Sequence, residues 1–192
     1  MDRIILASQS PRRRQLLEWA CLDFDVMVSE ADESYPAGIA IEEVPVFIAR
    51  EKALAVQQKL AKEEIIIAAD TIVVLADEII GKPSNREEAV RILHSLSGKK
   101  HLVITGVVLR KGSQEISFQD TTAVWFHHLT LPQIDFYVDK YHPYDKAGAY
   151  AIQEWIGVIG ISKIEGDFYN VMGLPVSRLM KELQPWLKEK IG

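Results

Sequence analysis

The sequence predicts an α/β fold built on a mixed β-sheet flanked by helices, and three observations support this prediction. Short apolar runs typical of buried strands alternate with segments of helical periodicity, which indicates strands connected through helices. Two long strand-like stretches are separated only by Lys111-Gly112-Ser113, which indicates a hairpin and therefore antiparallel pairing within the sheet. No Gly/Ser linker, low-complexity tract or internal repeat interrupts the chain, so we expect a single domain over residues 1–192.

The elements of the first half follow from short local patterns. The apolar run Ile4–Ala7 is typical of a buried strand, and Ser10 followed by Pro11 is typical of a helix start. Phe24–Val28 alternates apolar and polar residues, as a half-buried strand does. The remaining predictions here are a polar loop over residues 29–43 and a helix over Val44–Lys62.

The elements of the second half follow in the same way. Ile65–Leu75 is typical of a strand, and Arg86–Leu96 has the periodicity of a helix that Ser84 or Asn85 caps. The other predicted elements are the two hairpin strands within His101–His128, a helix over Leu131–Tyr141, a strand over Val158–Ile164 and a closing helix over Leu174–Lys190, with Pro175 in its first turn.

Composition and charge indicate a chain that folds without a metal or disulfide and disfavour nucleic acid as its partner. Of the 192 residues, 48% are hydrophobic, and 22 Lys and Arg oppose 27 Asp and Glu, which gives a net charge of -5. A chain of this length buries roughly 70% of its unfolded surface and needs no metal or disulfide to fold. The acidic balance disfavours nucleic acid as a partner, because non-specific binding of duplex DNA depends on Lys and Arg.

We expect a cytoplasmic protein that does not interact with a membrane. The one cysteine, Cys21, has no intramolecular partner, which suits a reducing compartment, and we expect a packed thiol rather than a nucleophile. The N-terminal residues reverse the order of a signal peptide, because the charges follow the apolar run. No apolar stretch approaches the ~20 residues of a membrane span.

The first candidate site is the segment Ser8–Arg14, in which two serines and three arginines surround the start of a helix. Free N–H groups at a helix start bind anions, so arginines there oppose the helix dipole unless an anion such as a phosphate is bound. The alternative is a solvated basic turn beside an ordinary Ser-Pro cap.

The second candidate is Asp70, which lies inside the apolar strand Ile65–Leu75. An ionised carboxylate there costs several kcal/mol unless it is paired, hydrogen-bonded or bound to a metal, and such positions are often catalytic. Alternation along the strand places Asp70 on the face of Ala68 and Ile72. The alternatives are a structural salt bridge with an arginine, or a carboxylate that simply faces water.

Several weaker signals lie elsewhere. Lysine suits phosphate as a point charge, which applies to Lys52 and to Lys82 in Gly81-Lys82-Pro83, although surface lysines are common. Glu33 is either a metal ligand or a solvated loop residue. Gln153 offers both a donor and an acceptor, the pattern that complements a uracil-type base edge. The five histidines form no metal motif, and no Walker-type phosphate loop is present.

In combination and order, these segments resemble the Maf family of nucleotide pyrophosphatases along essentially the whole chain. The resemblance rests on LASQSPRRRQLL, Glu33, Lys52, AADTIVV, GKP, DKAGAYAIQ and IEGDFYNVMGLPVSRL. It implies an elongated fold of two lobes with a cleft, related to inosine triphosphatases. It also implies hydrolysis of a nucleoside triphosphate to the monophosphate and pyrophosphate with a divalent cation, Mg²⁺ or Mn²⁺.

The resemblance also implies roles for particular residues. Three positions separate pyrimidine-specific members from a 7-methyl-GTP pyrophosphatase type, and here they are Arg12, Thr71 and Gln153, as in the dTTP/UTP type. The triphosphate would lie among Ser8, Ser10, Arg12, Arg13, Lys52 and Lys82. Asp70 would act as the base for water directly or through the metal, and Glu33 and Asp70 are the candidate metal ligands.

Two questions stay open at the level of sequence. The alternative function is a non-catalytic nucleotide-binding regulator of cell division or septum formation, which would use the same basic cluster. The oligomeric state is also open, because Trp125, Phe126 and Trp155 suit either a core or the surface of a homodimer.

Overall fold

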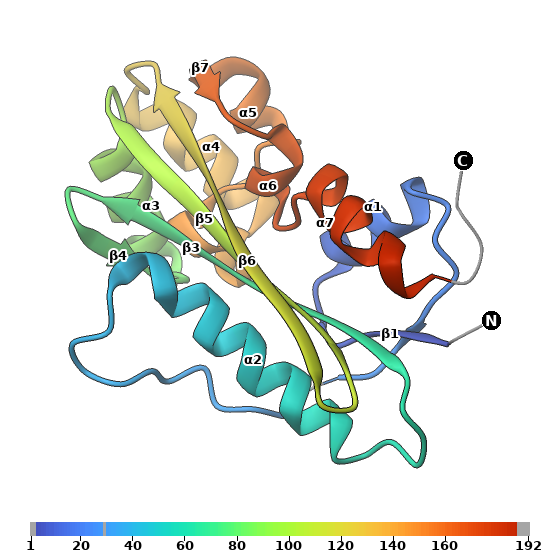
Figure 1. Ribbon diagram of the computed structural model, residues 1–192. Coiled ribbons are helices and arrows are strands. Elements are labelled where there is room, and N and C mark those ends of the chain that lie inside the picture. The colour runs from blue at the N-terminus through green and yellow to red at the C-terminus, as the bar shows by residue number, and fades with distance from the viewer. Residues whose placement is uncertain (1–2, 29, 188–192) are drawn as a thin grey trace. The chain divides into compact units, whose positions relative to one another are not determined.

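The structure is a computed structural model that describes residues 3–28 and 30–187. Within these residues a seven-stranded sheet has the order β2-β1-β3-β5-β6-β7, and β4 pairs with β3 (Figure 1). Its strands are β1 Ile4–Leu6, β2 Asp25–Val26, β3 Ile65–Leu75, β4 Glu78–Ile80, β5 Lys100–Lys111, β6 Gln114–Phe126 and β7 Ile161–Glu165. The α-helices are α1 Pro11–Trp19, α2 Val44–Gln57, α3 Arg86–Leu96, α4 Leu131–Tyr141, α5 Trp155–Gly160, α6 Phe168–Met172 and α7 Val176–Leu183.

The sheet is mixed, as the sequence predicts. β1 pairs in parallel with both β2 and β3, whereas β4 is antiparallel to β3 and β7 is antiparallel to β6. Residue contacts divide the chain into two compact units, and β3, β5 and β6 each contribute residues to both. The first unit comprises residues 1–70, 105–120 and 173–192, and the second comprises residues 71–104 and 121–172. The single domain over residues 1–192 and the cleft between two lobes stay predictions.

In the first unit, helix α2 covers one face of the sheet (Figure 1). Its small residues Ala49, Ala53 and Val56 form a buried stripe at helical spacing and pack in one cluster with Ile66 and Ala68 of β3. Gly106 of β5 makes the close approach of the helix start possible, because a Cβ at this position would lie 2.3 Å from the backbone nitrogen of Val46. Helix α2 therefore packs directly against strands β3 and β5.

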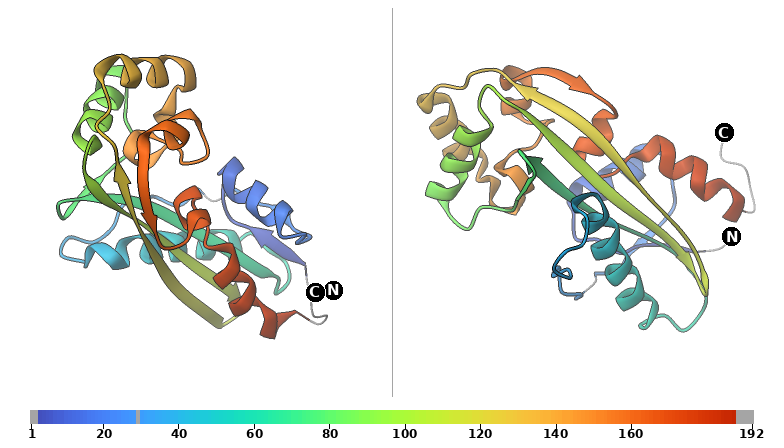
Figure 2. Two further views of the ribbon diagram at one scale, coloured as in Figure 1. Left: turned by 90° about the horizontal axis from the view of Figure 1, so that it is seen from above. Right: turned by 60° about the vertical axis from the view of Figure 1, so that its left-hand side comes forward.

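In the second unit, helices α3 and α4 lie side by side (Figure 2). Helix α3 begins after Asn85, whose side chain accepts a hydrogen bond from the amide of Glu88 at 2.9 Å. Arg86 joins the two helices, because its guanidinium pairs with Asp135 at 2.8 Å and with Asp139 at 2.6 Å. Helix α3 also contacts the two short 3-10 segments that follow α4, Pro143–Asp145 and Ala147–Ala149.

Most predicted elements are confirmed, and the departures have local causes. The strand at 65–75 and the helices at 86–96 and 131–141 have the predicted bounds, whereas the helix predicted over Val44–Lys62 ends at Gln57. The prediction of a strand over Val158–Ile164 is wrong at its start, because α5 precedes β7. Apolar runs of this length do not distinguish a strand from a buried helix. The closing helix is shorter than predicted, and its predicted end at residues 188–190 lies outside the described residues.

The structure also bears on the predictions for the strand at 24–28, for Cys21 and for three aromatic residues. The structure shows β2 as only two residues within the predicted Phe24–Val28, and it adds β4, which the sequence analysis missed. Cys21 is exposed rather than packed, since it lies in the turn after α1, where its φ is 54°, and not on the buried face of that helix. Phe126 lies in the core, whereas Trp125 and Trp155 are partly exposed. Among the described helices, none is long and apolar enough to cross a bilayer.

Candidate functional site

Asp70 and Lys52 meet because strand and helix periodicities place both side chains between β3 and α2. Alternation along β3 gives Asp70 the same face as Ala68, and that face packs on α2. On the helix, Lys52 stands three residues after Ala49 and four before Val56, within the stripe that faces the sheet. The predicted face of Asp70 is therefore confirmed, and its structural partner is a lysine rather than the arginine considered above.

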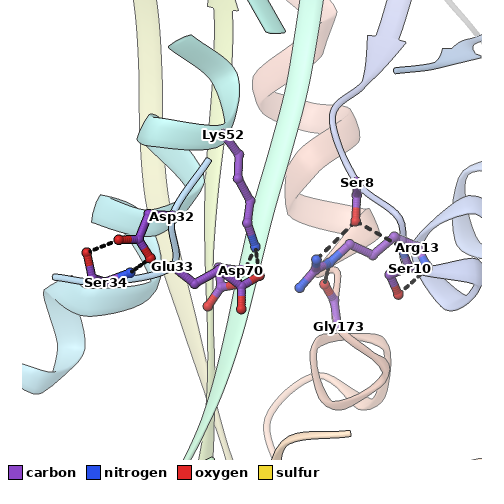
Figure 3. A network of polar contacts seen from close by, with 9 residues as sticks. All are labelled: Ser8, Ser10, Arg13, Asp32, Glu33, Ser34, Lys52, Asp70 and Gly173. Carbon is purple, nitrogen blue, oxygen red and sulfur yellow. Dashed lines mark hydrogen bonds and ion pairs between the residues drawn. The ribbon is translucent and has the colours of Figure 1, made fainter. Parts of the chain in front are cut away.

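The ammonium of Lys52 bridges two carboxylates (Figure 3). Its Nζ lies 2.7 Å from Oδ1 of Asp70 and 2.7 Å from Oε1 of Glu33. The side chains of Lys52 and Asp70 are 12% and 13% exposed, whereas that of Glu33 is 50% exposed. The loop that carries Glu33, between β2 and the short 3-10 helix Ile41–Glu43, thus brings one solvent-accessible carboxylate to a largely enclosed ion pair.

The second part of the site is built at the start of α1, where Ser10 is the N-cap and Pro11 the first helical residue, as predicted. Arg13 turns inward and is buried, so for this residue the alternative of a solvated turn is wrong. Its Nε donates to the carbonyl oxygen of Gly173 at 2.8 Å, and its Nη1 donates to Oγ of Ser8 at 3.2 Å (Figure 3). The same Oγ accepts from the amide of Ser10 at 3.2 Å.

Electrostatics connect the two parts of the site. Burial lowers the pKa of Arg13 below its ordinary value, and the neighbouring charge of Arg12 acts in the same direction. The carboxylates of Asp70 and Glu33 oppose this shift and favour the charged guanidinium. Three cations and two carboxylates therefore act on one another within the first unit, an arrangement that suits an anionic ligand.

Gly173 is a residue of the candidate site that the sequence analysis did not single out. It lies in the turn-rich segment before α7, within the motif IEGDFYNVMGLPVSRL. Its φ of 113° lies in the region that favours glycine, and its carbonyl oxygen holds the buried Arg13. The dense turn residues from Glu165 to Pro175 were the available signal, but they do not indicate which backbone atom meets an arginine.

The other three candidate residues, Thr71, Lys82 and Gln153, belong to the second unit. Thr71 is half-buried in β3, whereas Lys82 and Gln153 are exposed. The amide of Gly148 donates to the carbonyl oxygen of Gly81 at 3.2 Å, which joins the turn that carries Lys82 to the segment that carries Gln153. This hydrogen bond joins the two segments at Gly81 and Gly148 and is not a contact between Lys82 and Gln153 themselves.

The residues that could hold a divalent cation are Glu33 and Asp70. Their two oxygens contact the same ammonium, so they lie no farther apart than twice 2.7 Å. Among residues 3–28 and 30–187, no group of three or more His, Cys, Asp and Glu suits a metal. Two close carboxylates without further protein ligands fit Mg²⁺, which commonly takes one or two carboxylates together with phosphate oxygens and water.

Fold and site together define an α/β protein in which a lysine-paired carboxylate lies near a basic helix start. Comparison with known proteins identifies the family of this chain. It belongs to the Maf family, because the family model described as "Maf-like protein" matches residues 3–186.

Curated relatives cover nearly the whole chain and share the name "dTTP/UTP pyrophosphatase". Those from Parabacteroides distasonis and Bacteroides thetaiotaomicron are 52% and 50% identical, each over 95% of this chain and 95% of the relative. The relative from Cytophaga hutchinsonii is 49% identical over 94% of this chain and 83% of its own length. A solved dITP/XTP pyrophosphatase from Mycobacterium abscessus is 14% identical at a TM-score of 0.39, covers 65% of this chain and 72% of its own, and supports no inference.

Proposed function

We propose that this protein is a nucleoside triphosphate pyrophosphatase that hydrolyses dTTP and UTP to the monophosphate and pyrophosphate. Modified pyrimidine nucleotides are further candidate substrates. The observation that carries the proposal is the Lys52 ammonium, which lies 2.7 Å from both Asp70 and Glu33 beside the buried Arg13. Curated relatives with about half of their residues identical and the same printed activity support it.

The basic residues bind the triphosphate. Arg13 is held rigidly by Gly173 and Ser8, so its charge is fixed in place before the nucleotide arrives. Oγ of Ser8 accepts from Arg13 and Ser10, which leaves its hydroxyl proton to be donated to a phosphate oxygen. Further contacts to phosphate come from Ser10, Arg12, Lys52 and Lys82.

Asp70 orients the attacking water and either accepts its proton or holds the divalent cation. The hydrogen bond from the Lys52 ammonium at 2.7 Å holds this carboxylate in place on its strand. Glu33 and Asp70 would hold Mg²⁺ or Mn²⁺, which supplies charge neutralisation to the phosphates when bound. Asp70 is therefore the residue on which hydrolysis depends most.

Base recognition belongs to Thr71 and Gln153, together with Arg12. The side-chain amide of Gln153 carries a donor and an acceptor, which matches the edge of uracil or thymine. The partner is a free nucleotide rather than nucleic acid, and the cytoplasm is the compartment in which we place it. The homodimer stays a prediction.

Pyrophosphate release tests the proposal directly. Purified protein with Mg²⁺ or Mn²⁺ is incubated separately with dTTP, UTP, CTP, GTP and 7-methyl-GTP. We expect turnover of dTTP and UTP, and loss of turnover by at least about a hundredfold in Asp70→Asn, which keeps the shape of the side chain. Lys59→Met, which alters an exposed ion pair in the same unit, is the matched control and should retain activity.

Two outcomes would contradict the proposal. Turnover of 7-methyl-GTP alone would overturn the specificity. Tight binding of dTTP or UTP without pyrophosphate release, with every divalent cation tried, would instead favour the non-catalytic nucleotide-binding regulator.

A further inference from the structure

Gln153 is the exposed residue at the end of a buried segment in the second unit. Ala149, Tyr150, Ala151 and Ile152 are all buried, and Glu154 after it is partly buried. An exposed amide can recognise a base edge only if the backbone that carries it is fixed, because a mobile amide presents its donor and acceptor in many directions. The direction of the Gln153 amide therefore depends on the contacts that hold the chain on either side of it.

One hydroxyl group holds the chain on both sides of Gln153. Tyr137 is fully buried on α4, and its hydroxyl oxygen accepts a hydrogen bond from the amide of Ala151 at 3.1 Å. The same hydroxyl donates to Oε2 of Glu154. The backbone closes the turn between these points, because the amide of Glu154 donates to the carbonyl oxygen of Ala151 at 3.1 Å. Only Ile152 and Gln153 lie between the two anchored residues.

Two further contacts stiffen the same turn. The buried ammonium of Lys146 lies 3.7 Å from Oε1 of Glu154, so the carboxylate that accepts from Tyr137 also faces a positive charge. Gly157 of α5 lies in close contact with the turn. A Cβ at this position would lie 1.7 Å from the carbonyl oxygen of Ile152, so only a glycine allows this approach. A partly buried carboxylate, a buried tyrosine and a buried lysine thus surround a turn whose one exposed side chain is Gln153.

We infer that Tyr137 and Glu154 form a positioning pair that fixes Gln153 for discrimination between nucleotide bases. The inference rests on the proposed function and adds two residues that do not contact the substrate themselves. Without the pair, Gln153 remains present but its amide loses its fixed direction. Recognition of the base is then weakened, while the groups that act on the phosphates are unchanged.

The experiment compares two substitutions at Glu154 with one at Tyr137. Glu154→Ala removes the acceptor, whereas Glu154→Gln keeps a side-chain oxygen that can accept from Tyr137. Tyr137→Phe keeps the ring that stacks on Tyr141 at 5.0 Å but removes the hydroxyl. Tyr141→Phe is the matched control, because it removes a hydroxyl from the same helix outside the turn.

Steady-state kinetics with UTP and GTP give the main result. We expect Glu154→Ala and Tyr137→Phe to raise KM for UTP at least about fivefold while kcat stays within about twofold, and to reduce the UTP-to-GTP ratio of kcat/KM about tenfold. Glu154→Gln and Tyr141→Phe should keep this ratio within about twofold of wild type. Amide exchange of residues 147–154 should be faster in Tyr137→Phe than in Tyr141→Phe, because the bond to Ala151 is lost.

The contradicting results are separate from those that test the proposed function. An unchanged UTP-to-GTP ratio in both Glu154→Ala and Tyr137→Phe would overturn the inference, as would an equal fall in kcat for all nucleotides. The wild-type protein serves as the reference in the same assay. If it releases no pyrophosphate from either nucleotide, the proposed function fails, and that failure is recognised before any variant is measured.

Discussion

Replacing Lys52 with methionine removes the ammonium between Asp70 and Glu33 and leaves a side chain of similar length. With lysine in place, the two carboxylate oxygens that contact its ammonium lie no more than twice 2.7 Å apart, and this separation is used for the variant. At ~5 Å and an effective dielectric constant of about 20, two unit negative charges repel by about 3 kcal/mol. Because Glu33 is half exposed, solvent screening reduces this to about 2 kcal/mol.

The expected result is a loss of stability that a divalent cation partly restores. A loss of about 2 kcal/mol lowers the melting temperature of a chain of this size by roughly 4–8 °C in the presence of a chelator. Saturating Mn²⁺ should raise the melting temperature of Lys52→Met more than that of wild type, since the cation takes the place of the ammonium. Thermal unfolding with and without Mn²⁺ measures both effects.

Lys59→Met is the control for this measurement. Lys59 lies 3.5 Å from Glu30 in an ion pair whose side chains are well exposed, so its loss should change stability by no more than about 0.5 kcal/mol. A melting temperature of Lys52→Met equal to or above that of wild type, with no response to Mn²⁺, would refute the reasoning that this ammonium holds the two carboxylates together.

Three further predictions concern Arg13, Gly157 and His101. Arg13→Lys should cost about 1–3 kcal/mol and raise KM for UTP, because one ammonium does not reproduce the fixed guanidinium bond to Gly173; chemical denaturation and kinetics measure this. Gly157→Ala should cost at least about 1–3 kcal/mol in urea unfolding, since its Cβ would meet the carbonyl oxygen of Ile152. Burial lowers the pKa of His101 from 6.5 to about 4, so only the unfolded chain gains a proton between these values and stability falls as pH decreases through that range. The loss is of the order of 3 kcal/mol, and His101→Gln should flatten this pH dependence.

Long periodic segments could be predicted from the sequence because their signal is local. Ile65–Leu75 and Arg86–Leu96 have the predicted bounds, since strand and helix periodicity depends on neighbours a few residues away. The segment before β7 could not be assigned in this way. Its apolar residues suit a strand or a helix equally, and the close packing of Gly157 on Ile152 belongs to a helix start that only the folded chain displays.

For the candidate site, the sequence by itself determined which residues are candidates for the chemistry, and the tertiary structure decided what each one contacts. A carboxylate inside an apolar strand needs compensation wherever it lies, so Asp70 stands out in the sequence alone. That the compensation comes from Lys52, that Arg13 turns inward to Gly173, and that Tyr137 anchors both sides of Gln153 depend on packing between distant segments. The physical reason is that the need to pair a buried charge is local, whereas the partner is set by whichever element the fold brings within hydrogen-bond distance.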